Sequence, residues 1–185
     1  MSPPLDAAVA ALRAGGVIAY PTEAVYGLGC DPLNEAAVAR LFELKQRPPH
    51  QGVLLIAADF AQLHGYVDAE ALSPAARARV LATWPGPHTW IFPRAATAPD
   101  WLARAHEGIA VRVTAHDLAA HLCRAFGGAL VSTSANRHAQ PPARSADDVR
   151  ATFHAELAYI LQGEVGGLER PTPIRDANSG ELVRR

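Results

Sequence analysis

Residues 17–47 read VIAYPTEAVYGLGCDPLNEAAVARLFELKQR, and this stretch decides the expected fold. Its run 17–20 is rich in β-prone residues and follows two glycines, which predicts a strand. The polar turn Pro21-Thr22-Glu23 ends that strand, and the glycines within 26–30 predict a hairpin that allows a close backbone approach. Asn34 predicts the N-cap of an amphipathic helix that two later prolines stop.

Short apolar runs alternate with helical patterns along the rest of the chain. Further strands are predicted at 53–57, 90–92, 109–113, 129–131 and 159–161. Helices are predicted at 6–14, 34–45, 59–63, 73–83, 101–105, 118–126 and 145–153, the last with a capping box of Ser145 and Asp148. Residues 163–173 predict a loop, and 174–176 lead into a short tail. This alternation, without a linker or a repeat, predicts one α/β domain over residues 1–185.

The composition is that of an ordinary intracellular globular protein. The 185 residues are 49% hydrophobic and 19% charged, and the net charge is −1. This charge argues against nucleic-acid binding over the whole surface, although a local basic cleft stays open. Cys30 and Cys123 have no motif spacing, so neither a disulfide framework nor a zinc site is predicted. No signal peptide or membrane-spanning run is recognised, and we expect a cytoplasmic location.

Lys45 and Arg47 form the basic end of the helix that starts after Asn34. The chain has 17 lysine and arginine residues, and Lys45 is the only lysine among them. Lysine binds phosphate as a point charge and arginine as a planar fork, so the pair suits a triphosphate. The alternative is a solvated helix end, where cations complement the helix dipole. The spacing leaves both interpretations open.

Other polar residues follow predicted strands, where ligands of open α/β sheets bind. Thr22 follows the strand at 17–20, and Ser132-Thr133-Ser134-Ala135-Asn136 follows the strand at 129–131. The second segment is either an ordinary turn or a loop whose hydroxyl and amide groups bind an anion.

Arg112 interrupts the apolar strand predicted at 109–113. An unpaired guanidinium is costly to bury, so Arg112 should face a carboxylate. That carboxylate belongs either to another side chain, in an internal salt bridge, or to a ligand.

Several familiar site patterns are absent from the sequence. It contains no G-x-x-x-x-G-K-[ST] phosphate loop, no H-E-x-x-H and no G-x-S-x-G. Gly27-x-Gly29 lacks the third glycine of a dinucleotide-binding fingerprint. The eight histidines are scattered without ligand spacing. The sequence therefore excludes a Walker-type nucleotide hydrolase and predicts neither a hydrolase triad nor a protein metal site.

Taken together, several motifs resemble the YrdC-type threonylcarbamoyl-AMP synthase family. They are Tyr20-Pro21-Thr22-Glu23-x-x-Tyr26-Gly27-Leu28-Gly29, Lys45-x-Arg47-Pro48, Trp84-Pro85-Gly86-Pro87-x-Thr89, Val111-Arg112-Val113 and Ser132-Thr133-Ser134-Ala135-Asn136. They keep their order over nearly the whole chain, and the ending resembles the short bacterial form. The resemblance implies a twisted mixed sheet with flanking helices and a large basic cavity. It also implies that L-threonine, bicarbonate and ATP are converted to threonylcarbamoyl-adenylate and pyrophosphate.

The same resemblance implies roles for individual residues. Lys45 and Arg47 would hold the ATP phosphates as the catalytic cations, and Ser134 and Asn136 would lie near the α-phosphate. Threonine would contact Thr22, Tyr26, Arg112, Ser132 and Thr172, with its carboxylate on Arg112. Mg²⁺ is expected with ATP, held mainly by the phosphates. No role is transferred to His50.

Two other functions remain as alternatives. A non-catalytic module could dock tRNA or another RNA on a basic concave surface, which predicts steep salt dependence and no need for threonine. A related domain occurs in the hydrogenase-maturation carbamoyltransferase, whose acylphosphatase and zinc-finger segments are not found in this sequence. The synthase interpretation implies a separate downstream complex that transfers the threonylcarbamoyl group to tRNAs reading ANN codons. It leaves direct contact between this chain and tRNA open.

Overall fold

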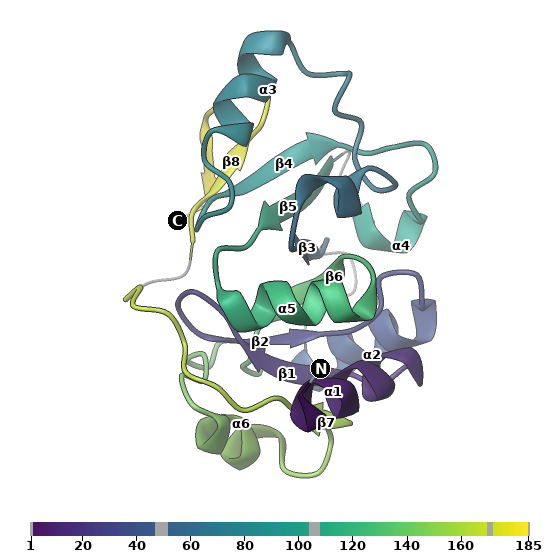
Figure 1. The fold of residues 1–185 in the computed structure, drawn as a ribbon, viewed down its shortest axis with the longest axis vertical. Helices are drawn as coiled ribbons and strands as arrows, with labels where there is room; N and C mark the ends of the chain where they lie inside the picture. The colour runs from purple at the N-terminus through teal and green to yellow at the C-terminus, as the bar shows by residue number, and fades with distance from the viewer. Residues whose placement is uncertain (1, 47–51, 104–107, 170–171, 185) are drawn as a thin grey trace.

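A nine-stranded mixed sheet forms the centre of the protein in a computed structural model that describes residues 2–46, 52–103, 108–169 and 172–184. The strand order across the sheet is β7-β1-β2-β6-β3-β5-β4-β8-β9 (Figure 1). The strands are β1 Ile18–Pro21, β2 Tyr26–Gly29, β3 Leu54–Ala57, β4 Thr89–Pro93, β5 Gly108–Val113, β6 Leu130–Ser134, β7 Tyr159–Ile160, β8 Ile174–Asp176 and β9 Leu182–Arg184. The helices are α1 Pro3–Arg13, α2 Glu35–Lys45, the short 3₁₀ helix η1 Phe60–Leu63, α3 Pro74–Leu81, α4 Asp100–Ala103, α5 Asp117–Phe126 and α6 Ala146–Phe153.

The sheet combines parallel and antiparallel pairs. β7 with β1, β3 with β5, and β4 with β8 pair in parallel, and the other neighbouring strands pair antiparallel. β6 is the central connection, because it lies between β2 and β3 and is antiparallel to both. The predicted α/β fold with a mixed sheet and flanking helices is therefore confirmed.

One face of the sheet is partly covered by α1 and α5, which lie side by side in front of the strands in Figure 1. Ile18 and Tyr20 of β1 contribute to the hydrophobic cluster beneath these helices. Ile56 of β3 and Leu130 of β6 extend this cluster across the sheet, and both are fully buried. Burial of such large apolar side chains is the main favourable term in folding.

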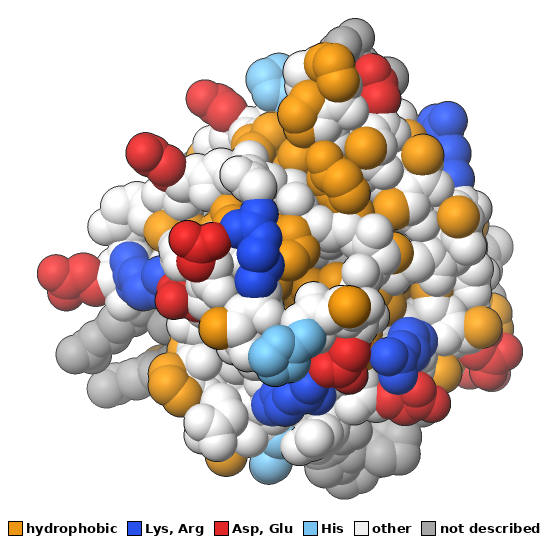
Figure 2. All heavy atoms as spheres, turned by 90° about the horizontal axis from the view of Figure 1, so that it is seen from below, with side chains coloured by type: hydrophobic (Ala, Val, Ile, Leu, Met, Phe, Trp, Pro, Cys, Tyr) orange, Lys and Arg blue, Asp and Glu red, His pale blue; other side chains and the backbone are white. Residues whose placement is uncertain are grey.

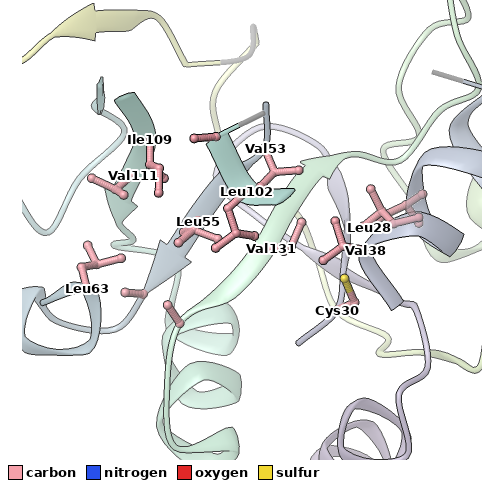
Figure 3. Close-up of a cluster of buried hydrophobic side chains, with 14 of the residues drawn as sticks. Leu28, Cys30, Val38, Val53, Leu55, Leu63, Leu102, Ile109, Val111 and Val131 are labelled. Atoms are coloured by element: carbon pink, nitrogen blue, oxygen red, sulfur yellow. The ribbon is translucent and has the colours of Figure 1, made fainter. Parts of the chain in front are cut away.

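The opposite face carries the larger hydrophobic cluster, part of which is drawn in Figure 3. Leu55 pairs with Val111 on one side and with Val131 on the other, so these residues form a row across β5, β3 and β6. Val38 of α2 lies beside Leu28 of β2 at the end of this cluster (Figure 3). Since side chains alternate along a strand, the residues between these positions point to the other face.

Local capping explains where several helices begin. The Asn34 side chain accepts a hydrogen bond from the backbone N–H of Ala37 at 3.0 Å, as predicted for α2. Ser145 and Asp148 form the predicted capping box of α6. α1 begins earlier than residue 6, at Pro3, because a proline fits the first turn of a helix, where its missing N–H has no partner to lose.

The C-terminal segment differs from the prediction of a short tail. Residues 174–176 and 182–184 form strands β8 and β9 instead. β8 pairs in parallel with β4, and β9 pairs antiparallel with β8. Leu182 and Val183 stay exposed, so apolar burial gives these strands no sequence pattern. Pairing with the existing edge of the sheet decides their structure.

Gly29 lets β2 lie close to its neighbours, which predicts the effect of adding a methyl group. A Cβ atom at this position would lie 2.5 Å from the carbonyl oxygen of Val131 and 2.7 Å from Cε1 of Tyr20. We therefore expect Gly29→Ala to lower the free energy of unfolding by about 1–3 kcal/mol. Urea denaturation followed by circular dichroism measures this loss.

Gly128→Ala is the matched control, because no heavy atom lies within 4 Å of a Cβ atom built there. It should change the free energy of unfolding by less than about 0.5 kcal/mol. Equal stability of the two variants would contradict the close approach of β2.

Candidate active site

A cavity of about 890 Å³ opens on the sheet face opposite the larger hydrophobic cluster. Ser132, Leu54 and Ala110 line it as a row of paired residues on β6, β3 and β5. On β5 the residues that line the cavity are Gly108, Ala110 and Arg112, which alternate with the buried apolar residues of that strand. The first two are small and leave room for a ligand, and the third places a charge in the wall.

The charged residues among the described lining are three cations and one carboxylate. Lys45 comes from the end of α2, Arg112 from β5 and Arg184 from β9. Glu23 comes from the turn between β1 and β2. The positive charges come from separate elements, so the cavity can meet more than one anionic group of a ligand.

Lys45 is buried, with 4% of its surface exposed, although it is the last residue of α2. Its Nζ donates hydrogen bonds to the carbonyl oxygen of Ser134 at 2.5 Å and to that of Asn136 at 3.0 Å. Asn136 Oδ1 accepts a third hydrogen bond at 3.2 Å. The interpretation of Lys45 as a solvated helix end is therefore wrong. Gln46, in the left-handed conformation, ends the helix before the prolines, and Arg47 and His50 lie outside the described residues.

The sequence left residues 132–136 open as an ordinary turn or an anion-binding loop, but the segment begins as a strand. Residues 132–134 continue strand β6, because Thr133 and Ser134 pair with β2 and Ser132 pairs with β3. Strand neighbours on both sides override the preference of serine for turns. The chain leaves the sheet only at Ala135.

Asn136 organises the loop that follows β6. Its Oδ1 accepts a hydrogen bond from Ser134 Oγ at 2.6 Å, and its Nδ2 donates to the carbonyl oxygens of Arg137 at 2.9 Å and Gln140 at 2.8 Å. Together with Lys45, these contacts fix the end of α2 to the end of β6. A cation with polar groups on a fixed backbone can bind phosphate.

Arg112 and Glu23 form a buried ion pair in the cavity wall. The distance between Arg112 Nη2 and Glu23 Oε2 is 3.3 Å, and the two side chains are 8% and 9% exposed. Arg112 Nη1 also donates to Thr172 Oγ1 at 2.6 Å, and Glu23 Oε1 accepts from Thr114 Oγ1 at 2.6 Å. The internal salt bridge that the sequence left as one option is present, and both partners also line the cavity.

Thr22 and Tyr26 shape the turn between β1 and β2. Thr22 Oγ1 donates a hydrogen bond to the carbonyl oxygen of Val25 at 2.7 Å, within the turn. The Tyr26 hydroxyl donates to the carbonyl oxygen of Gly163 at 2.7 Å and accepts from its N–H at 3.1 Å. Burial raises the pKa of the Tyr26 phenol, against the opposing effect of the hydrogen bond to Gly163. Tyr26 therefore stays protonated and holds the segment after β7 to β2.

All predicted site residues that the structure describes line the same cavity: Thr22, Tyr26, Lys45, Arg112, Ser132, Ser134, Asn136 and Thr172. The sequence assigned no site role to Glu23 or Arg184, which line the cavity, or to Thr114, which donates a hydrogen bond to Glu23. Glu23 could have been found, because a carboxylate two residues after a buried strand is a natural partner for Arg112. Arg184 could not, because it belongs to a strand without an apolar pattern.

Three further properties of the described residues limit what the protein can do. The described residues contain no group of three or more histidine, cysteine, aspartate or glutamate side chains that could hold a metal ion. Burial raises the pKa of Cys123 to about 12, and that of Cys30 is also raised, so neither thiol forms a reactive thiolate at neutral pH. No helix in the part of the chain that the structure describes is both long and apolar enough to cross a bilayer.

Comparison with known proteins gives a consistent result over nearly the whole chain. The Sua5/YciO/YrdC family model, which is described as "Telomere recombination", matches residues 10–185. A protein from Stenotrophomonas maltophilia (strain K279a) named threonylcarbamoyl-AMP synthase is 58% identical over 180 residues, which cover 97% of each chain. A protein of the same name from Xanthomonas campestris pv. campestris (strain B100) is 54% identical over 99% of this chain and 98% of its own.

A solved structure shares the fold. The structure of Sua5 from P. abyssi complexed with L-threonine has a TM-score of 0.84 and 32% sequence identity. The match covers 93% of this chain and 50% of that one, so this chain spans about half the length of that protein.

The contacts of Lys45 predict that this residue stabilises the fold, in addition to any role in binding a ligand. Lys45→Met keeps most of the side-chain length and removes the donor of the hydrogen bonds to Ser134 and Asn136. We expect the free energy of unfolding to fall by about 1–3 kcal/mol, because buried carbonyl groups lose a partner. Urea denaturation provides the measurement.

Arg40→Met is the control on the same helix. Arg40 is exposed and forms a surface ion pair with Glu43 at 3.2 Å. Its replacement should change the free energy of unfolding by less than about 0.5 kcal/mol. A Lys45→Met variant as stable as Arg40→Met would show that these hydrogen bonds do not hold the loop.

Proposed function

The chain belongs to the Sua5/YciO/YrdC family, and from this premise we propose that it is a threonylcarbamoyl-AMP synthase. Such an enzyme converts L-threonine, bicarbonate and ATP to threonylcarbamoyl-adenylate and pyrophosphate. The observation that carries the proposal is one cavity with cations at separate positions, Lys45 beside the loop after β6 and Arg112 in β5. Relatives that are 54% and 58% identical over 97–99% of this chain bear the name of this enzyme.

The nucleotide would bind on the Lys45 side of the cavity. Three oxygen atoms of Ser134 and Asn136 already orient the ammonium group. A phosphate oxygen could replace the contact with Asn136 Oδ1, which is the longest of the three at 3.2 Å. Ser134 and Asn136 would then lie near the α-phosphate, and Arg47 would add a second cation.

Threonine would bind on the Arg112 side, where its carboxylate would form a charge-assisted hydrogen bond with the guanidinium group. Thr172 holds Nη1 of Arg112, and Ser132 lies in the same wall. Thr22 and Tyr26 close this end of the cavity through the turn after β1.

The chemistry that we propose needs no protein nucleophile. The threonine amine takes up CO₂ derived from bicarbonate and loses a proton to form a carbamate, whose oxygen attacks the α-phosphorus in line and displaces pyrophosphate. The protein would position the reactants and stabilise negative charge with Lys45 and Arg47. Positioning alone contributes about 7–11 kcal/mol in favourable cases.

Mg²⁺ would enter the site as part of the ATP substrate. Phosphate oxygens are the usual ligands of Mg²⁺ in such sites, together with water and one or two carboxylates. Glu23 is the one carboxylate among the described lining residues, and it is paired with Arg112. The donor set therefore fits an ion held by the nucleotide rather than by a protein cage.

The product would serve a separate complex that transfers the threonylcarbamoyl group to tRNAs reading ANN codons, which would place the protein in the cytoplasm. Direct RNA binding is less favoured as the main activity. Figure 2 shows acidic and basic side chains interspersed on the face in view, without a field of one sign. A net charge of −1 also gives little general attraction for RNA.

Pyrophosphate release by the purified protein tests the proposal. We expect release from MgATP only when both L-threonine and bicarbonate are present, because the carbamate is the attacking group. A coupled assay that converts the released pyrophosphate to phosphate should be run with each co-substrate omitted in turn. Release without threonine, or no release together with salt-sensitive RNA binding, would contradict the synthase and favour the RNA-binding module.

A further inference from the structure

Two buried polar atoms in the cavity wall have no hydrogen-bond partner among the described residues. They are Oε2 of Glu23 and Nε of Arg112. The first is an acceptor and the second a donor, and the side chains to which they belong form the ion pair of the wall. Buried polar atoms without a partner are uncommon and costly in folded proteins. A ligand that supplies one donor and one acceptor at this place would satisfy both.

The zwitterion of an α-amino acid has this combination of groups. Its carboxylate is an acceptor and its ammonium is a donor, and both are bonded to the same carbon. If the carboxylate binds Arg112, the ammonium group must lie close by, and Glu23 Oε2 is only 3.3 Å from Arg112 Nη2. We infer that Glu23 binds the α-ammonium group of the amino-acid substrate. This inference rests on the proposed function, because it takes threonine as that substrate.

The surroundings of Glu23 fix its carboxylate for such a role. Thr114 Oγ1 donates to Oε1 at 2.6 Å and itself accepts from the backbone N–H of His116 at 3.1 Å. The carbonyl oxygen of Glu23 accepts from the N–H of Leu168 at 3.2 Å. A Cβ atom at Gly166 would lie 2.5 Å from that oxygen, so the backbone is closely packed. Oε1 is thus hydrogen-bonded within the protein, whereas Oε2 faces Arg112 Nη2 at 3.3 Å in the ion pair but accepts no hydrogen bond from a described residue.

Glu23 would then decide which carboxylic acids the cavity accepts. An acid that lacks the amine would bring its negative charge beside the Glu23 carboxylate and would leave Oε2 without a hydrogen bond. Leaving a buried polar group unpaired is how protein sites reject close analogues of their substrates. The site should therefore select α-amino acids over the corresponding α-hydroxy acids.

The competing explanation gives Glu23 only the task of holding Arg112 in place. In that case its loss would weaken every carboxylate ligand to the same degree. Binding of the amino acid and of its hydroxy analogue would change together, and the selectivity between them would stay constant. The ratio of the two dissociation constants therefore separates a contact with the ammonium group from a structural role.

The first measurement uses the wild-type protein and isothermal titration calorimetry. L-Threonine is compared with 2,3-dihydroxybutanoate of matching stereochemistry, which has a hydroxyl in place of the amine. We expect the analogue to bind at least about tenfold more weakly, as for the loss of one charge-assisted hydrogen bond. Equal binding of the two acids would overturn the inference without any variant.

The second measurement uses Glu23→Gln, with Glu164→Gln as a charge-matched control on an exposed side chain of the neighbouring segment. Glu23→Gln should weaken threonine binding about 10- to 100-fold and leave the analogue unchanged or bound more tightly, so that the selectivity collapses. Glu164→Gln should keep both constants. A proportional loss for both ligands in Glu23→Gln would overturn the inference.

The outcomes keep this inference apart from the proposed function. If the wild-type protein binds no threonine, with or without MgATP, the synthase proposal fails, and the assignment of Glu23 fails with it. If threonine binds and the selectivity is absent or survives in Glu23→Gln, only the assignment of Glu23 fails. Should Glu23→Gln not fold, as judged by circular dichroism, the wild-type comparison decides alone.

Discussion

The burial of the Arg112 guanidinium in a central strand is the constraint on which the site depends. A charge in this position destabilises the fold by several kcal/mol unless other groups pair with it. The partners come from distant parts of the chain, Glu23 from the turn after β1 and Thr172 from the segment before β8. The pairing of this one charge therefore brings together elements that enclose the cavity. These elements come from both halves of the sheet, which β6 connects.

Lys45 provides a second buried charge with a different environment. Its Nζ donates hydrogen bonds to neutral carbonyl and amide oxygens of Ser134 and Asn136. These contacts orient the positive charge of Lys45 toward the loop after β6. Arg112 is paired with the carboxylate of Glu23, so the two buried cations of the cavity wall lie in different electrostatic surroundings.

Much of the fold could be predicted from the sequence, because the helix-capping residues and the pattern of apolar residues favour the same helices and strands. Asn34 caps α2, Ser145 and Asp148 cap α6, and the apolar run of β3 lies in the middle of the sheet. The extension of β6 over Ser132–Ser134 could not be predicted, because it depends on pairing with β2 and β3. Strands β8 and β9 were missed for the same reason.

The sequence predicted which residues line the cavity better than it predicted the contacts that these residues make with one another. The motifs named residues that meet in one cavity, since each motif lies at the end of a strand or helix that borders it. The sequence could not show that Lys45 turns inward to the loop after β6, because helix ends are usually solvated. Nor could it choose between a salt bridge and a ligand for Arg112, because that depends on the position of Glu23.

The most direct test of the account is a crystal structure of the protein with L-threonine and α,β-methylene-ATP, which cannot release pyrophosphate. The account predicts both ligands in the cavity of about 890 Å³, with the threonine carboxylate on Arg112 and the triphosphate beside Lys45. A structure with either ligand bound outside this cavity, or with the triphosphate away from Lys45, would contradict it.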